Sequence, residues 1–241
     1  MKILILQACE QSYNKLLDIS KINKQYYADK HGYDLLSLEI NWNSVKPAVW
    51  MIPTVICKIL CDKQYNDYDY IFWSDVDSLI MNFDIRLEDI IMQGQCCDLI
   101  TNLWNFESEY NYTNLNGNID IIPGKSVWFM ICTGNWLIKN NEWNRRFFNT
   151  LCNDPRFLRK ELATNPMGDE FAFTVYYLSQ PEIRKHFYFL PIETFLTVGE
   201  KNNVLHETAK VPFYKEKDFI IHYPHLPLIE REEAMKAICH Y

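Results

Sequence analysis

Residues 68–82 have the sequence YDYIFWSDVDSLIMN, in which an apolar and aromatic run leads directly into Asp75 and Asp77. The segment 68–73 is nearly all aromatic or aliphatic, which favours a strand that is buried on both faces of a sheet. In open α/β sheets, ligands bind beyond the carboxyl ends of the strands. The stretch therefore predicts an α/β fold in which the two carboxylates lie at the ligand-binding edge of the sheet.

Strand-like and helix-like segments alternate on both sides of this stretch. An apolar run at residues 3–6 predicts a first strand, and apolar residues at helical spacing over about 11–30, followed by a glycine, predict a helix. A strand at 33–40 and a helix at 53–63 complete a βαβαβ order before the two aspartates. Further strands are predicted near 98–102, 128–132, 136–139, 188–191 and 218–223, further helices near 142–153 and 169–178, and a surface loop at 105–118. This order predicts a mostly parallel central sheet flanked by helices.

Residues 1–241 are predicted to form a single domain with no linker, and their composition excludes several classes of protein. The formal net charge of -7 argues against a nucleic-acid partner, because neutralising phosphates requires a basic face. The 7 glycines lie far apart, so neither a G-x-G-x-x-G dinucleotide segment nor a P-loop is present. If this protein binds phosphate, another source of positive charge is needed.

Cysteine usage and hydropathy bear on the compartment. The 8 cysteines include no C-x-x-C pair and lie mostly among apolar residues, which is typical of reduced, buried thiols rather than of a disulfide framework. No run reaches the roughly 18 apolar residues of a transmembrane helix, and the first apolar run is too short for a secretory signal. We therefore expect a cytoplasmic protein, or a protein of the Golgi lumen if the sequence is the catalytic part of a longer chain.

Asp75 and Asp77 are the strongest candidates for chemistry. Two closely spaced carboxylates at the end of a strand can hold Mn²⁺ or Mg²⁺ through oxygen ligands, together with the phosphates of a substrate. Such a cation would neutralise a diphosphate in place of the missing glycine loop. The alternative is an aspartate-rich turn in which Asp75 acts as a cap, and a D-x-D pattern by itself does not separate the two.

The segments around these aspartates resemble nucleotide-sugar glycosyltransferases of the GT-A fold. Segment 26–34, YYADKHGYD, is similar to the early Y-A-x-x-H-G-Y-D of the galactosyl- and mannosyltransferase family named after GMA12 and MNN10, which also contains plant xyloglucan xylosyltransferases. Segment 68–82 is similar to the D-x-D region of that family. Looser similarity follows in the same order at TGNWLIKN (133–140), GDEFA (168–172) and FIIHY (219–223). The resemblance covers most of the chain and implies a GT-A-like domain, a nucleotide-sugar donor and retention of anomeric configuration.

The resemblance also implies a metal site. Asp75 is expected to face the ribose of the donor or the metal, and Asp77 to ligate the metal directly. His222 ends a predicted strand, and a neutral imidazole suits a third ligand of Mn²⁺. The alternatives are that His222 is a buried histidine bonded to backbone, or that His225 takes the ligand role.

Further residues are expected around the sugar. Asp169 and Glu170 open a predicted helix, where one carboxylate would hydrogen-bond sugar hydroxyls or stabilise positive charge at the anomeric carbon. Alternatively, both acids only complement the helix dipole. Gly134 is assigned to the donor-binding surface and Asn135 to a sugar hydroxyl, unless Asn135 merely completes a turn. Trp104, in a polar stretch, is the aromatic residue best suited to stack on an acceptor.

Two departures from the family pattern affect the expected contacts. Met51 stands where the family usually has a lysine before the second helix, so donor contacts there would depend on Lys46 or Lys58. Segment 222–225, HYPH, lacks the Gly-Cys that commonly follows the family histidine, which changes the loop on the acceptor side.

Together these patterns predict a metal-dependent glycosyltransferase that moves a hexose or pentose from a UDP- or GDP-sugar to a glycan or other hydroxyl acceptor. No residue is an obvious covalent nucleophile, so a same-face displacement is the expected mechanism. The alternatives are a metal-dependent phosphohydrolase or phosphotransferase on the same carboxylates, and a catalytically silent nucleotide-sugar-binding module.

Overall fold

The computed structural model of the chain describes residues 1–44, 46, 48–94, 96–105, 129–157, 168–201 and 203–239. Its centre is a six-stranded sheet with the strand order β2-β1-β3-β8-β5-β9. The strands are β1 (Ile3–Glu10), β2 (Asp34–Ile40), β3 (Tyr70–Ser74), β5 (Leu99–Thr101), β8 (Asn135–Lys139) and β9 (Phe187–Phe189). Within this sheet β8 runs antiparallel to β3 and β5, and the other ladders are parallel. The predicted mostly parallel α/β sheet is confirmed.

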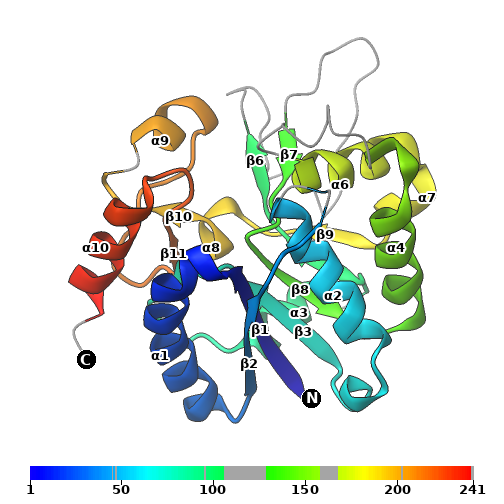
Figure 1. Cartoon of the computed structure of the whole chain (residues 1–241), viewed down its shortest axis with the longest axis horizontal. Coiled ribbons are helices and arrows are strands. Elements are labelled where there is room, and N and C mark those ends of the chain that lie inside the picture. Colours follow the sequence, from blue (N-terminus) through cyan, green and yellow to red (C-terminus); the bar gives the residue numbers. More distant parts are fainter. Residues whose placement is uncertain are drawn as a thin grey trace.

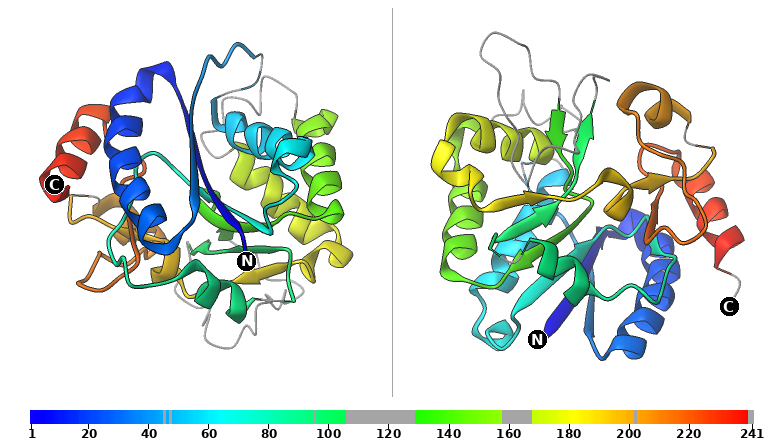
Figure 2. Two further views of the ribbon diagram at one scale, coloured as in Figure 1. Left: turned by 90° about the horizontal axis from the view of Figure 1, so that it is seen from below. Right: turned by 180° about the vertical axis from the view of Figure 1, so that it is seen from behind.

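Helices cover both faces of this sheet (Figures 1 and 2). One face carries α2 (Met51–Cys61), α4 (Glu142–Asn153) and α6 (Gly168–Ser179), and the other carries α1 (Asn14–His31) and α3 (Leu87–Gln93). Side chains of β3 alternate between the two cores, with Ile71 and Trp73 in the first and Tyr70 and Phe72 in the second. Because all five residues of β3 are buried, the strand fixes the start of the D-x-D turn firmly.

Two smaller sheets accompany the central one. One has the order β10-β11-β4, formed by β10 (Thr197–Val198), β11 (Ile220–His222) and β4 (Ser78–Ile80). The other is an antiparallel ribbon of β6 (Leu103–Asn105) and β7 (Phe129–Ile131). Pairing of β4 with β11 brings the last strand of the chain beside the residues that follow β3.

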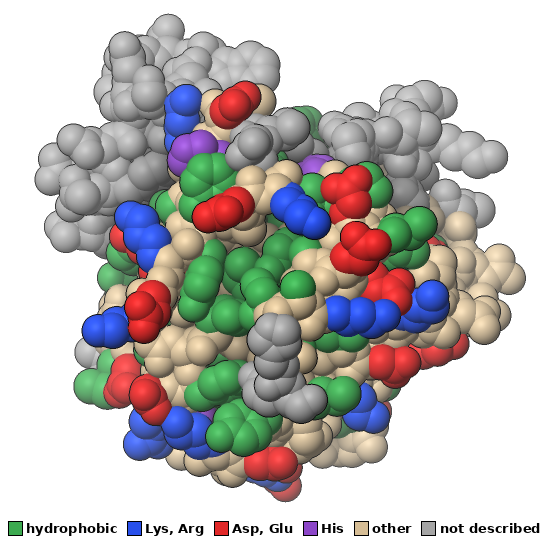
Figure 3. Space-filling model, turned by 90° about the vertical axis from the view of Figure 1, so that its left-hand side faces the viewer, with side chains coloured by type: hydrophobic (Ala, Val, Ile, Leu, Met, Phe, Trp, Pro, Cys, Tyr) green, Lys and Arg blue, Asp and Glu red, His purple; other side chains and the backbone are tan. Residues whose placement is uncertain are grey.

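The remaining elements are short, apart from the C-terminal helix. They comprise 3-10 turns at Gln11–Tyr13, Ala48–Trp50, Lys63–Tyr65 and Pro155–Phe157, and the helices α7 (Pro181–Arg184), α8 (Ile192–Phe195), α9 (Asn203–Ala209) and α10 (Leu228–Ile238). Helix α10 lies against α1. Figure 3 shows that face, where hydrophobic side chains gather at the centre and charged ones surround them. A hollow of about 300 Å³ beside α10 is lined in part by Tyr214, Tyr223 and Ile238.

Most predicted elements are confirmed, with shifts of a few residues at their ends. Helix α4 begins and ends where the sequence predicts, and α1 ends at Gly32, which has a left-handed φ of 73°. The sequence patterns miss the strands β4, β6 and β10 and the helices α3, α7, α8, α9 and α10. Of the predicted loop 105–118, residues 106–118 lie outside the described residues.

The hydropathy of the helices and the exposure of the thiols bear on two of the expectations. Among the described residues, no helix is both long and apolar enough to cross a membrane. The eight cysteines are free thiols, and Cys9, Cys97 and Cys132 are buried, whereas Cys61 and Cys96 are exposed. The expected burial of thiols therefore holds for part of the set.

Candidate metal centre

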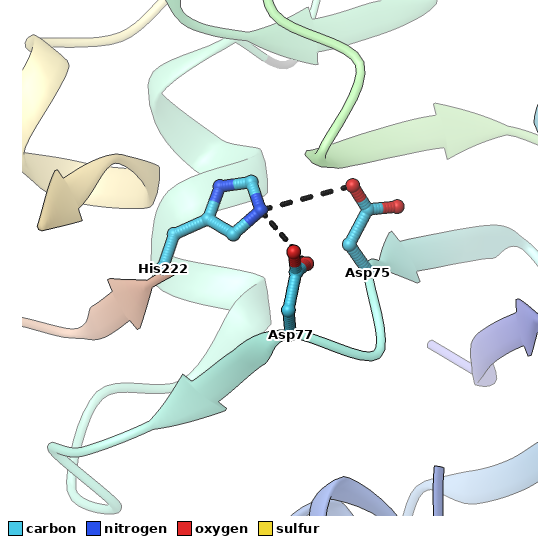
Figure 4. Close-up of side chains that lie close together, drawn as sticks. All are labelled: Asp75, Asp77 and His222. Carbon is cyan, nitrogen blue, oxygen red and sulfur yellow. Dashed lines mark hydrogen bonds and ion pairs between the residues drawn. The ribbon is translucent and has the colours of Figure 1, made fainter. Parts of the chain in front are cut away.

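Asp75 and Asp77 lie in the turn that connects β3 to β4. The backbone N–H of Asp75 donates to the carbonyl of Gly134 at 2.8 Å, which ties the turn to the start of β8. The indole N–H of Trp73 donates to Oδ1 of Asp75 at 2.8 Å. These two contacts fix the direction of the Asp75 carboxylate and leave its second oxygen facing His222 (Figure 4).

His222 reaches the two aspartates from β11. Antiparallel pairing places it opposite Ser78 of β4, and the next residue, Tyr223, donates its backbone N–H to the carbonyl of Asp77 at 3.0 Å. Nε2 of His222 lies 3.0 Å from Oδ1 of Asp77 and 3.8 Å from Oδ2 of Asp75 (Figure 4). Two segments that are far apart in the sequence thus converge on one point.

The chemistry of this donor set fits a divalent cation. One atom from each of Asp75, Asp77 and His222 can be chosen so that all three lie within 4.8 Å of one another. Two carboxylate oxygens and an imidazole nitrogen are ligands that Mn²⁺ and related cations accept. The other ring nitrogen of His222, Nδ1, is buried and has no hydrogen-bond partner among the described residues. Since the Asp75 side chain is 24% exposed and that of Asp77 only 9%, a substrate would approach from the side of Asp75.

The electrostatics of the two aspartates differ. Burial raises the pKa of Asp75 well above its ordinary value, and the negative charges of Asp77 and Asp169 raise it further. Burial also acts to raise the pKa of Asp77, but His222 and Arg231 outweigh it and hold that pKa well below its usual range. Asp77 is therefore an anion at neutral pH, and a cation beside Asp75 would relieve the cost of ionising it.

A buried lysine lies behind the D-x-D turn. Nζ of Lys24, in α1, donates to Oε1 of Gln7 at 2.9 Å, to the carbonyl of Ser74 at 3.0 Å and to the carbonyl of Asp75 at 2.7 Å. Its side chain is fully buried, and burial lowers its pKa to about 7 despite the neighbouring carboxylates, which act to raise it. Lys24 thus clamps two carbonyls at the end of β3 and adds positive charge close to the candidate metal centre.

An arginine completes the surroundings of Asp77. Nη1 of Arg231, in α10, lies 2.7 Å from Oδ2 of Asp77. The two oxygens of Asp77 therefore have different partners, His222 at one and Arg231 at the other.

Asp169 and Glu170 lie in the first turn of α6, beside the start of β8. The hydroxyl of Thr133 donates to Oδ2 of Asp169 at 2.9 Å, and the indole N–H of Trp104 donates to Oε1 of Glu170 at 2.8 Å. Burial raises the pKa of Asp169 to about 6, and burial together with the charge of Asp169 raises that of Glu170 to about 8. Glu170 is thus mostly protonated at neutral pH.

Comparison with known proteins places the chain in a family. The sequence profile of the galactosyl transferase GMA12/MNN10 family matches residues 2–225. The chain belongs to this family of glycosyltransferases. An alpha-1,2-galactosyltransferase of Schizosaccharomyces pombe is 24% identical over 215 residues, and the match covers 83% of this chain and 54% of that protein. A probable alpha-1,6-mannosyltransferase, MNN10, of Saccharomyces cerevisiae is 24% identical over 213 residues, with 83% and 52% covered. The chain spans about half the length of these two relatives.

Solved structures show the same fold. A glycosyltransferase involved in the glycosylation of the major capsid of PBCV-1 superimposes with a TM-score of 0.68 at 14% identity, covering 98% of this chain and 100% of that one. The galactosyltransferase LgtC, solved with donor and acceptor sugar analogs, gives a TM-score of 0.51 at 11% identity, covering 99% and 97%. The predicted GT-A-like fold of this family member is confirmed.

The structure brings most of the predicted site residues together. Gly134 and Asn135 lie beside the candidate metal centre, but their contacts differ from those expected. The carbonyl of Gly134 accepts a hydrogen bond from the backbone N–H of Asp75, at the candidate metal centre. Asn135 is fully buried, and its amide contacts Ser74, Ser78 and the carbonyl of Phe195. Such a placement supports a role in holding the D-x-D turn rather than in contacting sugar.

Two expectations around the site need correction. Trp104 is 3% exposed and donates to Glu170, so the expected exposed platform for an acceptor is wrong. His225 is not part of the donor set; it is exposed, has a left-handed φ of 62° and lies edge-on to Trp104. Nζ of Lys46 donates to the carbonyl of Cys152, and the expectation that Lys46 or Lys58 replaces the family lysine at Met51 stays a prediction.

Sequence patterns miss two basic residues of the site, Lys24 and Arg231. A signal for Lys24 exists, because it lies at helical spacing from the buried residues Ser20 and Ala28, where a solvated lysine would not fit. Arg231 follows Asp77 by 154 residues in a segment without clear periodicity. The sequence carries no signal for its position.

Gly134→Ala is expected to displace His222 and weaken metal binding. A Cβ at this position would lie 2.6 Å from Cε1 of His222 and 3.2 Å from Oδ2 of Asp75, and the histidine ring is buried. We expect the affinity for Mn²⁺ to fall by about 10- to 100-fold, as for other disturbances of ligand orientation. Electron paramagnetic resonance of free Mn²⁺ would measure it.

Gly32→Ala is the control for this substitution. Its Cβ would meet nothing within 4 Å, but the φ of 73° makes alanine strained there. The control should lower the stability and leave the Mn²⁺ affinity intact. Equal Mn²⁺ affinities for Gly134→Ala and the wild-type protein would contradict the role assigned to Gly134.

Glu170→Gln is expected to flatten the dependence of stability on pH. The pKa of Glu170 is about 8 in the folded protein and near 4.5 when unfolded, so the folded state holds the proton more tightly. Wild-type stability should therefore decline as pH rises from about 4.5 to 8, and Gln removes this loss while its amide oxygen can still accept from Trp104. Because Glu170 is partly exposed, we expect only about 1 to 2 kcal/mol of relative gain between pH 5 and 8.5. Urea unfolding at a series of pH values would test it, and parallel pH profiles for the two proteins would contradict it.

Proposed function

We propose that this chain is the catalytic domain of a metal-dependent, retaining glycosyltransferase that transfers a hexose or pentose from a UDP- or GDP-sugar to a glycan or other hydroxyl acceptor. The observation that carries the proposal is the convergence of Asp75, Asp77 and His222 at the carboxyl end of β3. Membership of the GMA12/MNN10 family supports it. When bound there, Mn²⁺ or Mg²⁺ would supply Lewis-acid neutralisation of the diphosphate leaving group.

The residues around the centre are assigned separate roles. Asp75, Asp77 and His222 hold the cation, and Asp75 also faces the donor because it is the most exposed of the three. Lys24 and Asn135 are positioning residues that hold the turn from beneath. Gly134 leaves room for the donor and for the ring of His222.

The acids of α6 are assigned to the sugar. Asp169 lies within electrostatic range of Asp75, and its negative charge would stabilise positive charge that develops at the anomeric carbon. Glu170, protonated at neutral pH, would donate a hydrogen bond rather than accept a proton. The leaving phosphate is assigned as the acceptor of the proton from the attacking hydroxyl, on the same face of the sugar. Product anomers resolved by NMR would test retention, and an inverted product would contradict it.

A matrix of nucleotides and metals tests the whole proposal. Thermal unfolding is measured with UDP, GDP and a panel of their sugars, each with Mn²⁺ and with a chelator. At a ligand concentration of 100 times its Kd, binding adds about 2.7 kcal/mol, which raises the Tm by roughly 5 to 10 °C in a protein of this size. We expect this shift only when the nucleotide and Mn²⁺ are present together, along with slow release of nucleoside diphosphate from the matching donor.

Three other outcomes would contradict the proposal in different ways. Release of orthophosphate would indicate a phosphohydrolase. Metal-dependent binding of the donor without turnover on any hydroxyl acceptor would indicate a binding module. If a nucleotide raised the Tm equally with Mn²⁺ and with a chelator, the Asp75, Asp77 and His222 centre would have no role in nucleotide binding.

A further inference from the structure

Arg231 forms a buried ion pair with an aspartate that the proposed metal needs. Its Nη1 lies 2.7 Å from Oδ2 of Asp77, and the exposed fractions of the two side chains are 18% and 9%. The other oxygen of Asp77 is 3.0 Å from Nε2 of His222. Both oxygens of Asp77 are therefore in contact with nitrogen groups, one of them a permanent cation.

The guanidinium of Arg231 is held through Nε, and its Nη nitrogens carry further N–H donors. Nε of Arg231 donates to the carbonyl of Leu226 at 2.8 Å, and the guanidinium lies 5.9 Å from the centre of the Tyr13 ring. A guanidinium has five N–H donors, and contacts with described residues account for one on Nε and one on Nη1. The three other N–H donors, all on the Nη nitrogens, are therefore available to another anion.

A divalent cation and this guanidinium would compete for Asp77. If Asp77 ligates a cation, two positive groups lie on one carboxylate within a few ångströms, in a buried site where screening is weak. The contact of His222 with Asp77 would also be given up, because a cation at Nε2 needs the lone pair of that nitrogen. Arg231 cannot lose its charge in this way, so its conflict with the cation remains.

We propose that Arg231 is a displaceable counter-cation of the metal centre. It neutralises Asp77 while no metal is present, yields Asp77 to the arriving cation, and turns its free N–H donors to the diphosphate that accompanies the metal. The inference rests on the proposed function, since it needs the metal and the diphosphate. Its consequence is a thermodynamic coupling: metal and nucleoside diphosphate each bind more tightly in the presence of the other, and part of this coupling passes through Arg231.

A purely structural ion pair makes a different prediction. If Arg231 only ties α10 to the D-x-D turn, its removal loosens the turn and weakens the binding of Mn²⁺. If Arg231 competes with the metal, its removal tightens the binding of Mn²⁺ alone. The sign of the change in Mn²⁺ affinity separates the two roles.

The experiment titrates Mn²⁺ into the full chain, follows free Mn²⁺ by electron paramagnetic resonance, and repeats the titration with saturating UDP or GDP. We expect Arg231→Met to bind Mn²⁺ alone about 3- to 10-fold more tightly than the wild type. With nucleotide, the wild type should gain more affinity for Mn²⁺ than the variant does. Arg231→Gln, which is neutral but polar, should change the affinity in the same direction and serves if the methionine variant folds poorly.

Two controls distinguish failure of the inference from failure of the proposed function. Lys236→Met removes a cation from the same helix, where Nζ contacts Glu232, and should leave Mn²⁺ affinity unchanged. Unchanged or weaker Mn²⁺ binding in both Arg231 variants would overturn the inference while leaving the proposed function intact. The Asp77→Asn variant shows how much of the Mn²⁺ binding depends on Asp77. If the wild-type protein binds Mn²⁺ no better than this variant, with or without nucleotide, the proposed function is overturned and the inference with it.

Discussion

Asp77→Asn is expected to abolish Mn²⁺ binding and to lower turnover of the nucleotide sugar by at least about 1000-fold, because a charged metal ligand is replaced by a weak neutral one. Asp77 is the least exposed carboxylate of the centre, and its pKa is held well below the usual range by His222 and Arg231 against the effect of burial. The asparagine keeps the size of the side chain, so the loss reports on charge. Release of nucleoside diphosphate and binding of Mn²⁺ would both be measured.

The same substitution should also destabilise the fold, because it leaves Arg231 partly buried without its counter-ion. We expect a loss of about 1 to 3 kcal/mol in the free energy of unfolding at pH 7. The pKa of Asp77 is depressed in the folded state, so this difference should be present above the unfolded pKa and shrink as pH falls below about 4. The matched control is Asp84→Asn, an exposed aspartate paired with Lys30, which should affect neither measurement strongly. An Asp77→Asn protein that keeps turnover within tenfold of the wild type would exclude Asp77 as a metal ligand.

Lys24→Met is expected to be the most destabilising single substitution among those considered, at about 3 to 5 kcal/mol. Methionine fills a similar volume but removes three hydrogen bonds, to Gln7, Ser74 and Asp75. Oε1 of Gln7 still accepts from Ser20 and the carbonyl of Asp75 from Ser78, so the cost is that of lost bonds, about 0.5 to 1.5 kcal/mol each and more where the donor is charged. Because two of these acceptors are backbone carbonyls of the turn that carries Asp75, we also expect a lower affinity for Mn²⁺. Urea unfolding and Mn²⁺ titration would measure the two effects.

Lys21→Met provides the matched control for this variant, since Lys21 is on the same helix and exposed. Its effect on unfolding should stay within about 0.5 kcal/mol. If the two lysine variants proved equally stable, the clamp at the end of β3 would not contribute to the fold. If Lys24→Met were destabilised but bound Mn²⁺ as the wild type does, Lys24 would be a structural residue only.

Much of the site can be predicted from local sequence, because a strand delivers its carboxyl-terminal residues to a known edge. The run 70–73 is aromatic or aliphatic throughout, so β3 and the position of Asp75 and Asp77 follow from pattern alone. His222 is found through its place at the end of a predicted strand and through family resemblance. The role of Trp104 is mispredicted because a polar neighbourhood in sequence does not show that the indole packs with Cys132, Leu196 and Val198 and donates to Glu170.

What the sequence by itself determined is the order of strands and helices, the D-x-D turn at a sheet edge and the absence of a glycine loop for phosphate. Tertiary structure alone decided that β11 pairs with β4, that Lys24 lies beneath the turn and that Arg231 lies on Asp77. The physical reason is that periodicity reports only which face of an element is apolar, whereas contacts across 154 residues depend on how the sheets are joined. The same holds for charge: burial shifts the pKa of Lys24 to about 7 and that of Glu170 to about 8, and burial is a property of the packed protein.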